Sequence, residues 1–210
     1  MEEVQGRLTL SYLSRVLSVI LHPVFMPLYG LLLIFNAPTF LVHLPYNIKR
    51  VIFLLAMVNM TVVPIAMLPL LRYRNLISTY SMESSRERVF PLTLGVLLYA
   101  VTTVIFYSYQ IPVLIKSFML AATVTSLILL VTTFWWKISI HSAGLGGLLA
   151  TAMALSIRMG ANLELLWIGL MLISALVMMS RLYLRVHSPA QVYTGFLAGF
   201  VTFLIIMVIF

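Results

Sequence analysis

The sequence of 210 residues contains no cysteine and no aspartate. Without cysteine the chain can form neither a disulfide nor a thiolate nucleophile, so nothing in it reports the redox state of its compartment. Without aspartate, a Mg²⁺ site built from clustered aspartates over a diphosphate is poorly supported. The histidines form no local ligand pair, so we expect no zinc site either; they are His22, His43, His141 and His187.

Charged residues are scarce as well. Only 9% of the residues are charged and 62% are hydrophobic, which leaves too little charged surface for a soluble domain of this size. We therefore predict an all-α, polytopic membrane protein organised as one domain over residues 1–210. Glu2 and Glu3 open the chain where a signal peptide would be basic, so we expect no removable leader. The formal net charge of +8 indicates anionic headgroups and phosphate as partners rather than nucleic acid.

The apolar runs predict seven transmembrane helices, with six as the alternative. Seven spans would place the chain termini on opposite faces of the membrane. The expected ranges are 15–36, 50–71, 91–108, 113–136, 142–159, 163–184 and 189–210. Pro23 and Pro27 should kink the first span, and Pro64 should interrupt the second. His22, beside the first of these prolines, is expected to bond a carbonyl group that the kink frees.

Three polar segments interrupt the apolar pattern, at 72–90, 137–144 and 180–191. Two predicted spans separate the first segment from the second, and two more separate the second from the third. All three segments should therefore emerge on one face of the membrane, which we call the site face. An odd number of intervening spans would have excluded a site shared by these segments.

The third polar segment reads Ser-Arg-Leu-Tyr-Leu-Arg-Val-His-Ser-Pro-Ala-Gln over residues 180–191. Polar groups at the end of a membrane helix are costly unless they reach water, a partner or a ligand, so the segment indicates a site. The guanidinium of Arg181 suits phosphate oxygens, and His187 can act as nucleophile or proton carrier near neutral pH. The pattern is therefore typical of phosphate handling.

This segment resembles the third signature motif of the type 2 phosphatidic acid phosphatase superfamily. In that motif Ser-Arg is followed by five residues, a His, three residues and an Asp. Ser180, Arg181 and His187 match the motif, whereas Gln191 stands in the place of the Asp. Residues 137–144, Lys-Ile-Ser-Ile-His-Ser-Ala-Gly, look like the second motif of the family, Pro-Ser-Gly-His.

The two remaining motifs match less well. In the second motif Ser139 and His141 are retained, while isoleucines replace the proline and the glycine. The first motif of the family is Lys, six residues and Arg-Pro. Arg88 is the candidate for its arginine, Ser81 occupies the lysine position, and the proline follows two residues late. Lys137, four residues before His141, could supply the missing cation.

The resemblance implies a metal-independent phosphatase without a cofactor, acting on a lipid phosphate or diphosphate. His187 would attack phosphorus to form a phosphohistidine, His141 would protonate the leaving oxygen, and Gln191 would orient the nucleophilic ring. The phosphoryl oxygens would be held by a further set of residues. That set is Arg88, Arg181, Ser139, Lys137 and Ser180.

Several of these residues have a structural alternative. Ser188 to Gln191 fits a helix capping box with proline at the first helical position, so Gln191 could simply start the last helix. His141 could be a helix-start histidine bonded to backbone, and Lys137 an interfacial anchor beside two tryptophans. Under these alternatives the chain is a catalytically impaired relative that binds or transports anionic lipid.

The site face should also collect three helix N-termini, near Pro91, Ser142 and Pro189. Their free N–H groups and positive dipole ends would favour a phosphate there. Most of the 13 Lys and Arg residues belong to this face, and the positive-inside rule then puts it in the cytoplasm. Most members of the family that the chain resembles act on the outer side, so both orientations in a cell membrane stay open.

Overall fold

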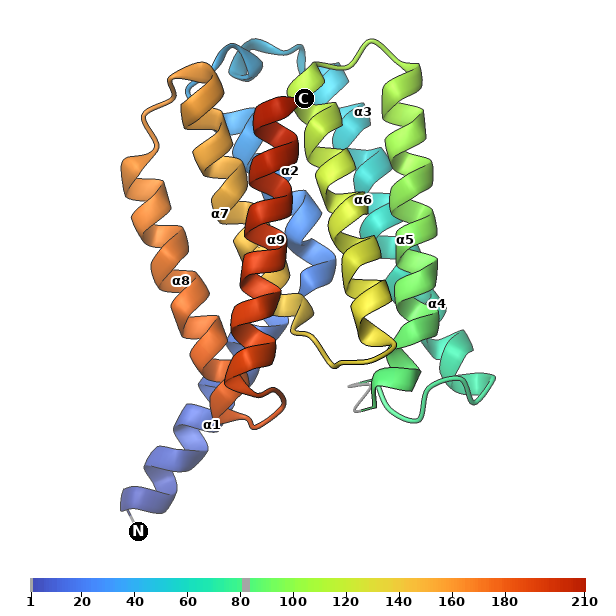
Figure 1. Ribbon diagram of the computed structural model, residues 1–210, viewed down its shortest axis with the longest axis vertical. Helices are drawn as coiled ribbons and strands as arrows, with labels where there is room; N and C mark the ends of the chain where they lie inside the picture. Colours follow the sequence, from blue (N-terminus) through green and yellow to red (C-terminus); the bar gives the residue numbers. More distant parts are fainter. Residues whose placement is uncertain (1, 81–83) are drawn as a thin grey trace.

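The protein is a bundle of long helices that run along one common axis (Figure 1). The computed structural model describes residues 2–80 and 84–210, and of residues 2–4, 6 and 7 it describes the backbone alone. Within the described residues seven helical segments are long and apolar enough to cross a membrane, and there is no strand. The predictions of an all-α integral membrane bundle and of seven spans are therefore confirmed.

Two of the spans are composite and five are single helices. The first runs over Leu8–Asn36 and combines most of α1 (Glu2–Ile20), η1 (Pro23–Phe25) and α2 (Met26–Asn36). The second combines α3 (Tyr46–Met57), η3 (Val58–Val62) and α4 (Val63–Tyr73), and η2 (Phe40–His43) precedes it. The others are α5 (Ser85–Ser108), α6 (Val113–Thr133), α7 (Ile140–Met159), α8 (Glu164–Tyr183) and α9 (Pro189–Ile209). The N- and C-termini lie at opposite ends, as predicted (Figure 1).

The breaks in the first two spans lie where the prolines predict them, and they lie side by side. His22 is the N-cap of the 3-10 helix η1, and its Nδ1 accepts the N–H of Val24 at 3.3 Å. The expectation that His22 bonds a freed carbonyl is therefore wrong, because the ring nitrogen caps an N–H instead. The π-helix η3 precedes Pro64, and Thr61 within it donates to the carbonyl of Val24 at 2.9 Å.

The third span begins at Ser85 and not near Pro91. Ser84 is its N-cap, with a hydroxyl that accepts the N–H of Glu87 at 3.3 Å, and this pair follows the Ser-x-x-Glu pattern of a helix start. Pro91 lies inside the helix. Arg88 is consequently held on the first turns of a helix and not on a loop, which gives its side chain a defined direction.

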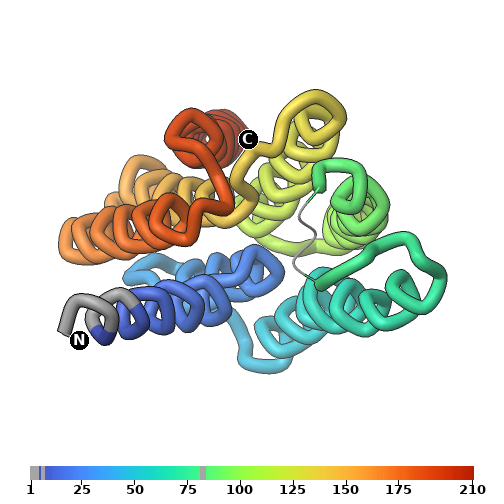
Figure 2. Tube along the Cα trace, turned by 90° about the horizontal axis from the view of Figure 1, so that it is seen from below, coloured from blue at the N-terminus to red at the C-terminus, as the bar shows by residue number. Residues whose placement is uncertain are grey.

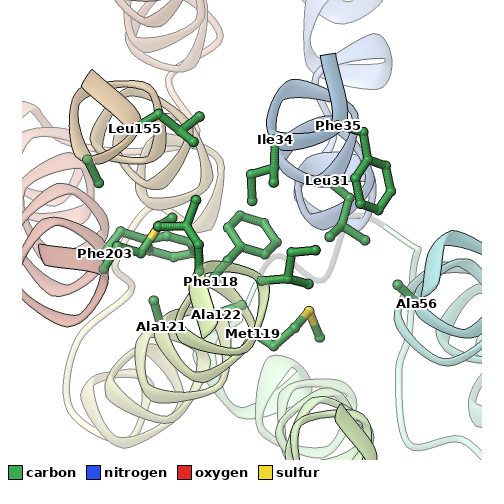
Figure 3. Packing of buried hydrophobic residues seen from close by; sticks show 14 of the residues in the cluster. Leu31, Ile34, Phe35, Ala56, Phe118, Met119, Ala121, Ala122, Leu155 and Phe203 are labelled. Atoms are coloured by element: carbon green, nitrogen blue, oxygen red, sulfur yellow. The ribbon is translucent and has the colours of Figure 1, made fainter. Parts of the chain in front are cut away.

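The core of the bundle is formed around α7, which is the most buried of the seven spans. It contacts α2, α6, α8 and α9. Large apolar side chains from several of these helices meet in one cluster (Figure 3). They include Leu31 from α2, Phe118 from α6, Leu155 from α7 and Phe203 from α9. The outer helices α5 and α8 leave many leucine and valine side chains exposed, as lipid-facing helices do.

Glycines bring α7 and α9 into backbone contact at the site face. A Cβ at Gly199 would overlap the carbonyl oxygen of Ala143, and one at Gly195 would overlap the carbonyl oxygen of Ser139. Gly146 faces α9 in the same way. This is the close packing that small residues spaced four apart allow between membrane helices. It fixes the start of α7 against the start of α9, and therefore the second motif against the third.

Candidate functional site

The three polar segments lie at one end of the bundle, as the parity of the predicted spans requires. Figure 1 shows the α4–α5, α6–α7 and α8–α9 connections at the same end as the N-terminus. Seen from that end, α1 runs beside α8 (Figure 2), and the two helices are in contact. The site-face end of the first span therefore lies against α8, which the motifs alone do not indicate.

The turn between α8 and α9 holds Arg181 and His187 in a fixed relation. The N–H of Val186 donates to the carbonyl of Arg181 at 3.3 Å, and the N–H of Arg185 donates to the carbonyl of Leu182 at 2.9 Å. This pair of bonds is the Schellman motif of a helix C-terminus. Arg185 has the left-handed φ of +53° that this motif requires. Ser188 then caps α9, so His187 is held between two well-defined helix ends.

Gln191 combines the two roles that the sequence left open. Its Oε1 accepts the N–H of Ser188 at 3.0 Å, and its own N–H donates to the Ser188 hydroxyl at 3.4 Å, so the predicted capping box is formed. The same Oε1 lies 3.3 Å from Nδ1 of His187. An amide oxygen can only accept, so this bond requires the proton on Nδ1 and leaves the lone pair on Nε2.

His187 is buried among cations, with 8% of its surface exposed. Burial and the nearby guanidinium groups of Arg88 and Arg181 lower the pKa of His187 to about 4, while the hydrogen bond to Gln191 acts in the opposite direction. The ring is therefore neutral at pH 7. A neutral ring with a free Nε2 is the form in which histidine can act as a nucleophile.

Ser139 is the N-cap of α7, which begins at Ile140, whereas the start predicted from the sequence is near Ser142. The Ser139 hydroxyl accepts two hydrogen bonds from Ser142, one from its N–H at 3.4 Å and one from its hydroxyl at 2.9 Å. Its own N–H donates to the carbonyl of Gln191 at 3.1 Å. The second and third motifs are thus joined by a direct hydrogen bond, and the Ser139 hydroxyl serves the helix start.

Ser18 on α1 contacts the key side chains of both motifs. Its carbonyl oxygen lies 3.2 Å from Nε2 of His141, and its hydroxyl accepts from Nη1 of Arg181 at 3.3 Å. Because a carbonyl only accepts, Nε2 of His141 carries the proton of that bond. Sequence reasoning missed Ser18. The available signal was a polar stripe of Ser14, Ser18 and His22 at intervals of four, the spacing of one helix face.

His22 is the second residue that sequence reasoning missed. Its ring lies edge-to-face against that of His141, with centroids 5.3 Å apart and planes at 83°. Two histidines that are far apart in the sequence are therefore neighbours in the fold, which separation along the chain could not reveal. No group of three His, Cys, Asp or Glu side chains that could hold a metal ion occurs within 2–80 and 84–210.

A cavity of about 670 Å³ opens among these elements. Four of the predicted site residues line it together, and they are Arg88, His141, Arg181 and His187. Arg15, Ser18 and His22 of the first span line the same cavity. No acidic side chain occurs among the described residues that line it. The charge at this end of the cavity is therefore positive, and it suits an anion.

The other predicted site residues do not line the cavity. They are Lys137, Ser139, Ser180 and Gln191. The Ser180 hydroxyl donates to the carbonyl of Leu176 at 2.8 Å within its own helix. Ser81, the residue at the lysine position of the first motif, lies outside the described residues. Of the predicted site residues, then, the arginines and histidines reach the cavity, whereas Ser139 caps α7 and the Ser180 hydroxyl bonds within α8.

The guanidinium of Arg181 retains donor capacity at this site. Nη1 is bonded to Ser18, whereas Nε is buried and has no hydrogen-bond partner among the described residues. Such a donor in a cationic cavity favours a ligand with several oxygens, such as phosphate.

The chain matches no protein-family model, no curated protein and no solved structure.

Proposed function

We propose that the protein is an integral membrane phosphatase that hydrolyses a lipid phosphate or diphosphate of the phosphatidate or isoprenoid type. The observation that carries this proposal is the convergence of Arg88, His141, Arg181 and His187 on one cavity. These are the residues to which the resemblance assigns phosphate binding, nucleophilic attack and proton transfer. Their convergence from three distant segments is unexpected for residues that only anchor helix ends.

In the first step Nε2 of His187 attacks phosphorus. A P–N bond forms, the P–O bond to the leaving group breaks, and the leaving oxygen takes a proton from His141. Because Nε2 of His141 donates to Ser18, the transferable proton is the one on Nδ1, so His141 must enter this step as the imidazolium. Arg88 and Arg181 stabilise the charge on the phosphoryl oxygens.

In the second step water attacks the phosphohistidine. The P–N bond breaks, a proton of the water passes to His141, and the phosphoryl group leaves as inorganic phosphate that carries the oxygen of the water. His187 returns to its neutral form with Nδ1 bonded to Gln191. The step needs no metal ion, since the two arginines and the helix start supply the positive charge.

A second function is favoured by one observation. The oxygen of Gln191 is neutral and is shared between His187 and the Ser188 N–H, so it compensates the imidazolium of the intermediate less than a carboxylate would. Loss of the corresponding carboxylate lowers turnover by about 10⁴-fold in serine proteases. The alternative proposal is therefore a cell-membrane protein that binds or transports an anionic lipid in the same cavity.

Phosphate release separates the two proposals. Purified protein is incubated with a panel of lipid phosphates and diphosphates in EDTA, and released phosphate is measured. The phosphatase proposal expects release by the wild type and an acid-labile phosphoenzyme. It also expects both to be lost in His187→Ala. The matched control is His43→Ala, which alters a histidine in η2, remote from the cavity, and should release phosphate normally.

His141→Ala adds a mechanistic test. Its task is proton donation to the leaving oxygen, so turnover should fall most for lipids with poor leaving groups and least for an aryl phosphate. Equal losses for both classes would contradict the assigned role. Binding of these lipids without release of phosphate by any of them would favour the binding function.

A further inference from the structure

The cavity extends far beyond the charged residues. Phe203 lines it together with His187, yet Phe203 lies 14 residues beyond Pro189 along α9, which corresponds to about 21 Å of helix axis. That depth is a large part of the ~30 Å hydrocarbon thickness of a bilayer. The deep part is lined mainly by apolar side chains from α2, η3, α4, α5, α6 and α7, among them Met60, Leu148 and Ala122.

The inner end of the cavity is built by two aromatic rings. Phe118 and Phe203 lie edge-to-face, with centroids 5.5 Å apart and planes at 65°. Each ring is seated on a glycine of another helix. A Cβ at Gly30 would overlap the Phe118 ring, and one at Gly147 would lie 2.9 Å from the Phe203 ring.

Behind the rings the bundle is closed. The core cluster continues through Leu31, Ile34 and Leu155, all with no exposed surface, and Figure 3 shows these side chains around the two phenylalanines. The cavity thus has a cationic mouth, apolar walls and a solid end. We call its apolar part the chain chamber, lined by Met60, Tyr99, Phe118, Ala122, Leu148 and Phe203.

We propose that the chain chamber takes one hydrocarbon chain of an anionic amphiphile, with its phosphate held at the mouth by Arg88 and Arg181, and that Phe118 and Phe203 set the longest chain that fits. The size supports a single chain, since about 670 Å³ lies in the range of ~300–1,000 Å³ for small-molecule sites. A helix of ~10–12 Å diameter would not fit. The identity of the reaction rests on the proposed function, but the binding of the chain does not.

Monoalkyl phosphates from butyl to hexadecyl provide the test. Their affinities for the wild type are measured by thermal stabilisation in one detergent. Each added methylene should raise affinity by up to about fourfold, until the chain reaches the two rings, after which affinity should stop rising. Partitioning of long chains into detergent is common to all variants and cancels when variants are compared at one chain length.

Two substitutions should move this limit in opposite directions. Phe118→Ala opens the end of the chamber, so the longest accepted chain should increase by several carbons. Ala122→Phe fills the chamber before its end, so long chains should lose at least tenfold in affinity while butyl phosphate binds as before. Phe118→Leu is the milder variant if Phe118→Ala does not accumulate. The matched control is Phe106→Ala, which removes a fully buried ring of the same core that does not line the cavity.

The outcomes are distinguishable from those of the phosphate-release experiment. A shifted chain-length profile without any phosphate release would support the chain chamber and contradict the phosphatase. Normal phosphate release with a profile that neither substitution moves would contradict the chain chamber alone. Failure of every alkyl phosphate to bind, or equal shifts in Phe106→Ala, would also overturn it.

Discussion

The Oε1 of Gln191 lies 3.3 Å from Nδ1 of His187 while it accepts the N–H of Ser188 at 3.0 Å. The second bond identifies this atom as the oxygen of the amide, because a backbone N–H needs an acceptor. The first bond then assigns the proton of His187 to Nδ1. A single side chain therefore starts α9 and selects the tautomer of the candidate nucleophile.

The first prediction concerns the missing charge at this position. Gln191→Glu keeps the length of the side chain and the capping bond, and it places a carboxylate beside His187. The pKa of His187 should rise from about 4, because the carboxylate favours the imidazolium. If the protein is a phosphatase, its turnover should increase roughly 10-fold or more. Phosphate release and a histidine NMR titration measure the two effects.

Gln191→Asp is the informative comparison, since it introduces the residue found in the motif that this segment resembles. Aspartate is shorter by one methylene, so it keeps the charge but reaches less far toward the ring. A helix N-terminus accommodates either carboxylate. An unchanged His187 titration in both variants would show that the contact between the two side chains is not maintained in the membrane protein.

The second prediction links His187 to stability. In the unfolded chain an ordinary histidine has a pKa near 6.5, whereas in the folded protein the pKa of His187 is about 4. Between these values the unfolded state binds more protons, so the stability contribution of neutral His187 is present above pH 6.5 and is lost as pH falls to 4. The full loss would be roughly 3 kcal/mol.

The measurement compares unfolding of the wild type and of His187→Asn across this pH range. The remaining histidines are common to both proteins, so their titrations cancel in the difference. The wild type should lose more stability on acidification than the variant. Parallel pH dependences would mean that His187 titrates normally and is not buried among cations.

Much of the architecture could be predicted from the sequence because hydropathy and helix ends are local properties. The seven spans, the kinks near Pro23 and Pro64, and the capping box of Ser188 and Gln191 all depend on residues close together in the chain. The start of α5 was misplaced because its first residues are polar and resemble a loop. The cap of α7 was misplaced because two serines, Ser139 and Ser142, both suit the position.

The parts of the site that could not be predicted depend on which helices become neighbours. The polar stripe of Ser14, Ser18 and His22 marks one face of the first span, but nothing in the sequence indicates that this face packs beside α8 and reaches His141. The chain chamber likewise depends on where the rings of Phe118 and Phe203 meet, far from any motif. Local patterns locate the residues at the site face, whereas tertiary packing decides which of them line the cavity.

The third prediction tests the glycine contact between α7 and α9. Gly199→Ala would place a methyl group on the carbonyl oxygen of Ala143, and backbone atoms cannot move aside as a flexible side chain can. The helices should separate at the site face, at a cost of about 1–3 kcal/mol or more. The matched control is Gly169→Ala on α8, where a Cβ meets nothing within 4 Å. The higher helix propensity of alanine should raise the free energy of unfolding of this variant by at most about 1 kcal/mol.

Unfolding in mixed detergent micelles measures both variants. The separation should also break the bond between the Ser139 N–H and the Gln191 carbonyl, so any activity should fall together with stability in Gly199→Ala. Equal stability of the two glycine variants would contradict a backbone contact at this position.

The last prediction concerns the turn that holds His187. Arg185 has a left-handed φ of +53°, which costs a side chain with a Cβ roughly 1–2 kcal/mol. Its side chain is exposed. Arg185→Gly removes this strain and adds some entropy to the unfolded chain, so a net gain of about 0.5–1 kcal/mol in the free energy of unfolding is expected, or roughly 1–3 °C in Tm.

Asn75→Gly, at φ +57°, should gain less stability because asparagine tolerates this conformation. Gly160→Ala, at φ +64°, should lose stability. A decrease of Tm in Arg185→Gly would mean that the exposed guanidinium makes a stabilising contact at the site face that outweighs the strain.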